Sequence, residues 1–405
     1  MDELDALFDK YLDNPPIIRN HRVLSHSFLP DSYPHRNNQM RDLASILATA
    51  LRGGRPSNVF IYGKPGTGKT CVTKFVLQKL ERKIQESPKS LSLLTVYINC
   101  KEVGSTNYSV YLAVAGAIDQ TLTIPATGLP TSEVYNRLLK VLDGLEDVIL
   151  TIVLDEIDEL VKKSGSEVLY SLTRVNQHLP LAQVSIIGIS NDTKFKDYLD
   201  ARVYSSLSEE EIVFTPYNAT ELIDILQERS EKALHPQVMM EGVVQKIAAI
   251  AAREHGDARR ALDLLRVAAE LAERQGLDKV CLRVVDEAKN HIERNTAQEV
   301  IRTLPLQSKV VMAAIYQLEK LDRSDVTSGL IYEVYCELCQ TFHVDKLSAR
   351  RVGDYINELD VLGIVEAKLV SKGRYGRTKR VNFALPKSLV REVLAEDSYL
   401  DGLFR

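Results

Sequence analysis

The sequence has no long hydrophobic run and few cysteines, and each lack excludes a class of protein. The longest apolar stretches, such as residues 148–154, are far shorter than the ~20 residues that a membrane helix requires. Five cysteines among 405 residues are too few for a disulfide framework and favour a reducing compartment. The 20 glycines and 14 prolines exclude a collagen-like or linker-rich chain. The acidic, polar opening, residues 1–10, does not resemble a signal peptide, so we expect a cytoplasmic protein without membrane partners.

Positive charge is not in excess either. The chain has 51 Lys and Arg against 55 Asp and Glu, a formal net charge of −4. This balance excludes a globally basic nucleic-acid binder but leaves room for a local basic surface. At about 150 residues per domain, the length predicts two or three domains.

The hydrophobic pattern predicts three successive units. Short β-branched runs at 59–62, 94–99, 149–154 and 184–190 alternate with helical patterns, which indicates an α/β fold with a parallel sheet over residues 1–215. Residues 216–295 have a helical pattern throughout, with a break at 256–257 and a helix end near Gly276. Residues 296–405 show three helical segments and then a hairpin, with its second strand expected at 381–385. This order is the outline of a winged helix.

A complete phosphate-binding motif, GxxxxGK[ST], follows the first predicted strand and opens a helix. Glycines allow backbone N–H groups to close around phosphate oxygens, and the helix N-terminus adds partial positive charge. The Lys69 amine would reach the outer phosphates of ATP or ADP, and the Thr70 hydroxyl would ligate Mg²⁺. A chance glycine-rich turn is the alternative. The motif consists of Gly63, Lys64, Pro65, Gly66, Thr67, Gly68, Lys69 and Thr70.

Two further strands end in polar residues at the same edge of the predicted sheet. The run at 149–154 delivers Asp155 and Glu156, and the run at 184–190 delivers Asn191. Asp155 would hold Mg²⁺, and Glu156 would orient or deprotonate the attacking water. Asn191 would contact the terminal phosphate or the water. An exposed acidic pair and an ordinary turn asparagine are the alternatives.

Together these segments resemble the AAA+ family and, more narrowly, archaeal origin recognition complex-type DNA replication initiators. The resemblance covers nearly the whole chain, as an α/β AAA+ P-loop domain, an all-α lid and a C-terminal winged-helix domain. Its motifs are SYPHRNNQ (32–39), the phosphate loop, LDEID (154–158), GISND (188–192), LDARVYSSL (199–207), FTPYNATEL (214–222) and GDARRALDLL (256–265).

The resemblance implies roles for several further residues. His35 and Arg36 would lie near the adenine or ribose, and Tyr217 and Arg229 would contact nucleotide from the lid side. Asn191 would be the first sensor. Arg202 would be an arginine finger acting on ATP of a neighbouring, related initiator subunit. Arg259 would be the second sensor, with Arg260 as the alternative; a surface role for Arg202 and lid packing for Tyr217 remain open.

Although the whole chain has a net charge of −4, positive charge is concentrated near its C-terminal end. Residues 340–391 contain eleven Lys or Arg and five Asp or Glu, a net charge of +6. Arg350 and Arg351 fall in the first turn of a predicted recognition helix, and the glycine-flanked segment around Arg374 would form a wing suited to the minor groove. A protein-binding winged helix whose charged face is only solvated is the alternative. The expected DNA contacts are Arg350, Arg351, Lys372, Arg374, Tyr375, Gly376, Arg377, Lys379 and Arg380.

The resemblance implies an ATP-regulated, chromosome-associated initiator that binds double-stranded origin DNA and helps to recruit or load the replicative helicase, with slow, regulatory ATP hydrolysis. Two alternatives remain: an AAA+ DNA motor such as a branch-migration helicase, and a nucleotide-gated transcription regulator. Cys336 and Cys339 lie near His343, but without a fourth ligand we interpret them as packed helix residues.

Overall fold

A computed structural model describes residues 16–86, 92–122, 124–207, 210–320, 325–371 and 377–403, together with Leu4, Asp5 and Phe8. Within this part the chain separates into two compact units, 1–285 and 286–405. No helix in it is both long and apolar enough to cross a membrane.

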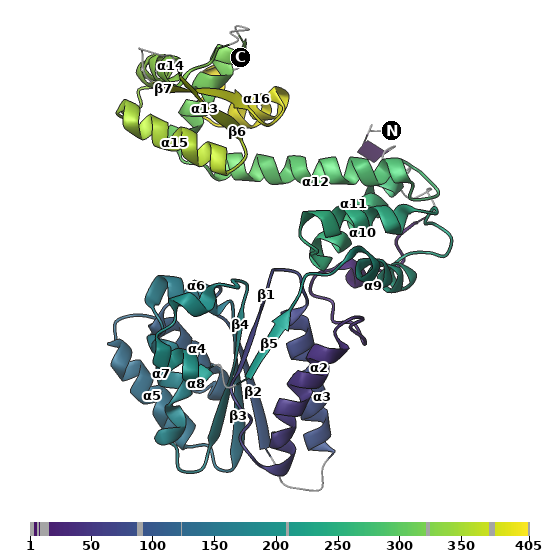
Figure 1. The fold of residues 1–405 in the computed structure, drawn as a ribbon, viewed down its shortest axis with the longest axis vertical. Coiled ribbons are helices and arrows are strands. Elements are labelled where there is room, and N and C mark those ends of the chain that lie inside the picture. Colours follow the sequence, from purple (N-terminus) through teal and green to yellow (C-terminus); the bar gives the residue numbers. More distant parts are fainter. Residues whose placement is uncertain are drawn as a thin grey trace. The chain divides into compact units, whose positions relative to one another are not determined.

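The first unit is built on a five-stranded, wholly parallel sheet with the strand order β2-β3-β4-β1-β5 (Figure 1). The four predicted strands are present, and β5 is a strand that the sequence pattern did not reveal. Its EEIVF sequence is short and exposes alternate residues at the sheet edge, so it lacks the continuous apolar run of the others. The strands are β1 (Val59–Gly63), β2 (Ser92–Asn99), β3 (Val148–Asp155), β4 (Gln183–Ser190) and β5 (Glu210–Phe214).

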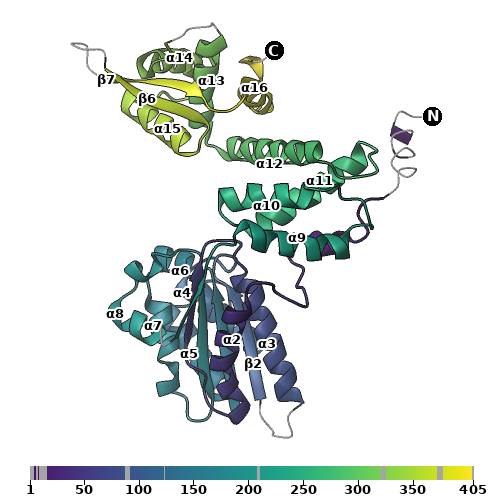
Figure 2. The ribbon, with the colours of Figure 1, turned by 45° about the vertical axis from the view of Figure 1, so that its right-hand side comes forward.

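Helices cover both faces of this sheet (Figure 2). Strand alternation divides the core: Val59 and Ile61 of β1 pack with one helix pair, whereas Phe60 packs with the helices of the other face. The pair is α2 (Asn37–Leu47) and α3 (Lys69–Gln85). The other face carries α4 (Asn107–Ile118), α5 (Thr131–Asp143), α6 (Ile157–Ser164), α7 (Glu167–Thr173) and α8 (Ala201–Leu207).

A helical lid follows β5 in the same unit. Its helices are α9 (Ala219–Ala233), α10 (Val243–Glu254) and α11 (Ala258–Arg274), and α12 (Leu282–Thr303) begins here. The break predicted at 256–257 separates α10 from α11, and Asp257 caps α11 by accepting from two backbone N–H groups. Gly276, φ 69°, follows the α11 C-cap as predicted.

The second unit is a winged helix. Three helices and the two-stranded antiparallel sheet of β6 and β7 enclose one apolar core. Strand β7 starts at Arg377, four residues before the predicted strand, because it pairs along the whole of β6 from Ser371 to Val365. A further helix, α16, was not predicted. The elements are α13 (Leu306–Lys320), α14 (Ser328–Thr341), α15 (Ala349–Val361), β6 (Val365–Ser371), β7 (Arg377–Phe383) and α16 (Lys387–Ala395).

Helix α12 is continuous across residue 296, where the sequence reading placed the start of the third domain. The domain boundaries predicted at 215/216 and 295/296 stay predictions.

Candidate functional site

The carboxyl ends of β1 and β3 and the lid enclose a cavity of about 560 Å³. Of the predicted phosphate-loop residues, Gly66, Gly68, Lys69 and Thr70 line it. Gly63, Pro65 and Thr67 complete the loop behind this lining, where the buried Thr67 hydroxyl donates to the Lys64 carbonyl oxygen at 2.9 Å.

Lys69 is a buried cation at the first position of α3, and the residue is 4% exposed. Its Nζ donates to the carbonyl oxygens of Gly63 and Lys64 at 2.8 and 2.9 Å. Burial lowers the pKa of this amine to about 8 because removal from water disfavours the charged form. Neutral carbonyls do not compensate the charge fully, so the arrangement fits an anionic ligand.

The end of β3 carries a linked set of oxygen ligands. The Thr70 hydroxyl donates to Asp155 Oδ2 at 2.7 Å, and the Tyr97 hydroxyl of β2 donates to the same oxygen. Register explains the contact between neighbouring strands, because Asn99 of β2 pairs with Asp155 of β3. Tyr97 was not predicted as a site residue. Within the described residues, no group of three or more His, Cys, Asp or Glu side chains forms a metal site.

Glu156 lines the cavity immediately after β3 and has a left-handed backbone, φ 56°. A glutamate rarely takes this conformation, which costs about 1 kcal/mol or more and is found preferentially at functional sites. Burial, followed by the nearby Asp155 carboxylate, raises the pKa of Glu156. Asn191 also lines the cavity, and its backbone N–H donates to Asp158 Oδ1 at 3.2 Å.

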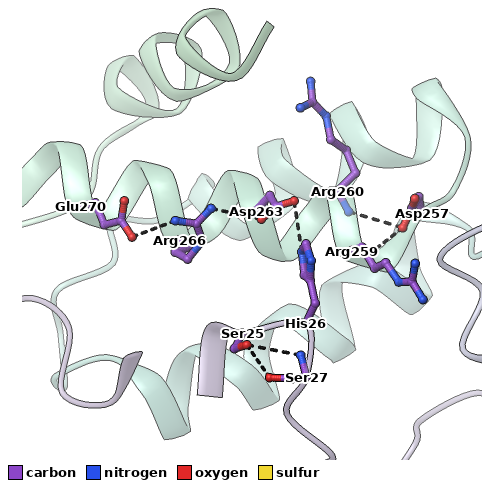
Figure 3. Close-up of polar contacts among 9 residues, drawn as sticks. All are labelled: Ser25, His26, Ser27, Asp257, Arg259, Arg260, Asp263, Arg266 and Glu270. Carbon is purple, nitrogen blue, oxygen red and sulfur yellow. Dashed lines mark hydrogen bonds and ion pairs between the residues drawn. The ribbon is translucent and has the colours of Figure 1, made fainter. Parts of the chain in front are cut away.

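The lid contributes Arg259 rather than Arg260 to this cavity. Both follow the helix cap Asp257, but Figure 3 shows their side chains extending in different directions. Arg259 lines the cavity, whereas Arg260 Nε donates to Glu254 Oε2 at 3.0 Å. The structure therefore distinguishes two candidates that the sequence left open.

Lid and phosphate loop touch directly at this point. The N–H of Ala258 donates to the Gly66 carbonyl oxygen at 3.2 Å. A β-carbon built on Gly66, φ 70°, would come within 1.6 Å of Asp257 Oδ1. Gly66 is thus required both for its backbone conformation and for the close approach of the lid.

His35 and Arg36 do not line the cavity. Arg36 is 2% exposed and fastens the phosphate loop to the start of the lid. Its Nε donates to the Thr67 carbonyl oxygen at 2.9 Å and its guanidinium stacks 3.7 Å from the Tyr217 ring centroid. His35 Nε2 lies 2.6 Å from Asp224 Oδ2 of α9.

Tyr217 and Arg229 do line the cavity from the lid side. Burial raises the pKa of Tyr217 and lowers that of Arg229. Arg229 is 8% exposed, donates to the Val23 carbonyl oxygen at 3.0 Å and lies over the Phe28 ring.

A part of the site that sequence reasoning missed is the N-terminal segment between Ser25 and Pro34. Its residues His26, Phe28 and Tyr33 line the cavity. His26 Nε2 lies 3.1 Å from Asp263 Oδ2 of α11, which ties this segment to the lid (Figure 3). Only Ser32, Tyr33 and Pro34 of this segment fall within a motif, SYPHRNNQ, whereas residues 25–31 gain their role from their position against α9 and α11.

Arg202 lies outside the cavity of its own chain. Its side chain is 69% exposed and its Nε donates to Asp200 Oδ1 at 3.2 Å. A residue that acts on a neighbouring subunit must be exposed in this way, and the role of Arg202 stays a prediction.

In the second unit, Arg350 and Arg351 occupy the first turn of α15, as predicted. Arg350 lines a groove between α14, α15 and β7, together with Lys379, which donates to Asn357 Oδ1. Arg380 is paired with Asp325 at 2.7 Å. Lys372, Arg374, Tyr375 and Gly376 lie outside the described residues, and of Arg377 only the backbone is described.

Comparisons with known proteins agree along the whole chain. Three family models match in succession: an AAA domain over residues 52–191, a Cdc6 AAA+ ATPase-type lid domain over 223–290, and a CDC6 C-terminal winged helix domain over 299–393.

Individual relatives match at nearly full length. The ORC1-type DNA replication protein of Pyrococcus furiosus is 52% identical over 403 residues, which is 99% of this chain and 95% of that protein. The protein of the same name from Thermococcus kodakarensis is 50% identical over 404 residues, 99% of this chain and 96% of that protein. The Aeropyrum pernix ORC1 protein, solved in complex with DNA, is 45% identical with a TM-score of 0.83, covering 96% of this chain and 99% of that one.

Proposed function

Because the chain belongs to the family of ORC1/Cdc6-type archaeal DNA replication initiators, we propose that it binds double-stranded origin DNA under the control of ATP and helps to recruit or load the replicative helicase. The observation that carries the nucleotide half of this proposal is the single cavity lined by Lys69, Thr70, Glu156, Asn191 and Arg259. The DNA half rests on the exposed arginines of α15 and on the DNA complex of the Aeropyrum relative.

The cavity fits a nucleoside triphosphate by the chemistry of its donors. Phosphate oxygens would replace the two carbonyl oxygens now bonded by Lys69 Nζ and would supply the countercharge that this buried amine lacks. The N-terminus of α3 adds partial positive charge at the same place. Arg259 would add a second cation from the lid, so that lid position becomes coupled to the bound phosphates.

Thr70 and Asp155 are the residues that would hold Mg²⁺, directly or through water. Their mutual hydrogen bond brings a hydroxyl and a carboxylate oxygen together, which are ligands that Mg²⁺ uses alongside substrate phosphates. The metal would neutralise charge that develops on the phosphate oxygens. The Tyr97 hydroxyl fixes the orientation of Asp155.

Glu156 is the candidate base for hydrolysis. Its raised pKa makes the carboxylate a better proton acceptor than an exposed glutamate. Asn191 would position the water, and Arg202 of a neighbouring subunit would complete the site. Since one chain lacks this last group in its own cavity, we expect slow turnover in the monomer.

In the winged helix, Arg350 and Arg351 project from the end of α15 that enters a major groove in related docking geometries. Lys379 lies beside the same groove and would contact phosphate. The remaining predicted contacts stay predictions: Lys372, Arg374, Tyr375 and Gly376 fall in the interval 372–376, outside the described residues, and Arg377 and Arg380 belong to β7.

The deciding experiment is genome-wide mapping of the bound protein with and without ATP, combined with steady-state ATP turnover in the presence of duplex DNA. An initiator should occupy a few discrete origins and hydrolyse few ATP molecules. Strong DNA stimulation with branch migration would instead establish a motor. Occupancy restricted to promoters, without helicase recruitment, would establish a transcription regulator and refute the proposal.

A further inference from the structure

An apolar groove of about 460 Å³ lies between α2 and α3, the two helices that pack on one face of the sheet. Its floor is formed by side chains that also belong to the core, such as Leu47 and Leu80, and its walls by Met40, Leu51 and Phe75. Neither the nucleotide nor the DNA proposal uses this surface.

The rim of the groove is exclusively basic. Arg41, Lys79 and Lys83 line it, and no acidic side chain does. Lys83 Nζ lies 2.7 Å from Glu86 Oε2. Within the described part of the chain, Arg41 and Lys79 make no ion pair. An apolar trough between cations suits an amphipathic helix with acidic flanks.

The chain itself contains such a segment at residues 2–13. Apolar residues at 4, 7, 8, 11 and 12 follow the i, i+3, i+4, i+7 spacing of a helix that inserts into a groove. Five acidic residues and one lysine give the segment a net charge of −4. Leu4 and Phe8 are helical and each is 60% exposed, so neither large apolar side chain is covered within its own unit.

We propose that residues 2–13 of one copy dock as an amphipathic helix into the α2/α3 groove of a second copy, with Leu4 and Phe8 as anchors and the basic rim paired with the acidic flanks.

The connection to the rest of the chain favours a second copy over the same chain. The N–H groups of Ile17 and Ile18 both donate to Glu273 Oε1 at 2.8 Å, which fixes the segment's end on lid helix α11. Only eight residues separate Phe8 from Ile17, and fully extended they span about 26–29 Å. Helix α3 runs away from the lid in both views (Figures 1 and 2).

The first test uses the full chain with a benzoylphenylalanine photocrosslinker in place of Phe8, mixed as equal parts of ¹⁴N- and ¹⁵N-labelled protein. We expect crosslinked dimers, with mixed-isotope crosslinks that map by mass spectrometry to α2 and α3. Crosslinks within one chain, crosslinks to any other surface, or the absence of dimers would each overturn the proposal.

The second test measures fluorescence anisotropy of a labelled peptide of residues 1–15 with the full-length protein. Ala44 lines the groove, whereas the neighbouring Ser45 is exposed on α2 and does not. We expect Ala44→Glu to raise the Kd at least tenfold and Ser45→Glu to change it less than twofold, with both variants folded by circular dichroism. The peptide Phe8→Ala change should weaken binding at least tenfold. Equal effects of the two protein variants, or unaltered binding of the changed peptide, would refute the docking model.

Discussion

If Lys69 binds the phosphates as proposed, its buried amine should make nucleotide affinity depend on pH in a range where few other groups titrate. In the free protein burial places its pKa at about 8, and a phosphate anion bonded to Nζ would raise it. Binding therefore favours the protonated amine. Affinity should be constant below pH 8 and fall as the pH rises above 8, because deprotonation of the free protein then competes with binding.

The magnitude follows from the protonated fraction. With a pKa of about 8, that fraction is about 0.9 at pH 7 and about 0.1 at pH 9, so the Kd for ATP should rise about tenfold over this interval, or about 1.4 kcal/mol. The nearby Cys71 and Tyr217 do not offset the change, since burial raises the pKa of each.

Isothermal titration calorimetry in buffers of different ionisation enthalpy measures both the Kd for ATP and the number of protons taken up on binding. Proton uptake per bound nucleotide should be near zero at pH 6.5, about 0.5 at pH 8 and about 0.9 at pH 9. Circular dichroism at each pH checks that the protein stays folded. A Kd that stays constant between pH 7 and 9, with no proton uptake, would refute this reasoning, because it would show that burial does not lower the pKa of Lys69.

Three further predictions concern single side chains. Glu156→Ala should leave the ATP Kd within about twofold and abolish hydrolysis, measured by phosphate release; normal turnover would remove Glu156 from the base role. Arg259→Ala should weaken ATP binding as measured by calorimetry. The matched Arg260→Ala variant removes a cation that pairs with Glu254 and should leave ATP binding unchanged. Equal effects of the two variants would contradict the assignment of Arg259 to the cavity. Arg350→Ala should weaken duplex binding and lower its salt slope by about one, whereas Lys320→Ala on α13 should change neither, and identical isotherms for the two variants would exclude α15 from the interface.

Local patterns were sufficient to predict the phosphate loop and the polar ends of β3 and β4. A parallel strand buried on both faces must be continuously apolar, so its end is visible in the sequence, and parallel strands end at one edge. The edge strand β5, Glu210–Phe214, was missed because a strand exposed on one side needs no such run. The early start of β7 follows from its pairing with β6, which no local pattern records. Helix α16 was overlooked although Leu389, Val390, Val393 and Leu394 have helical spacing after Pro386.

The chemical groups of the site are therefore readable from local sequence: a phosphate loop with its lysine, two carboxylates after a strand, and a basic C-terminal region. Three features depend on contacts between distant segments: Arg259 rather than Arg260 faces the cavity, Arg36 links the phosphate loop to the lid, and residues 25–34 form a cavity wall. The difference lies in the sequence separation of the residues that interact. Backbone conformation and hydrophobic periodicity are set by neighbours in sequence, whereas cavity walls and charge pairs are made by segments that meet only when the lid packs on the sheet domain.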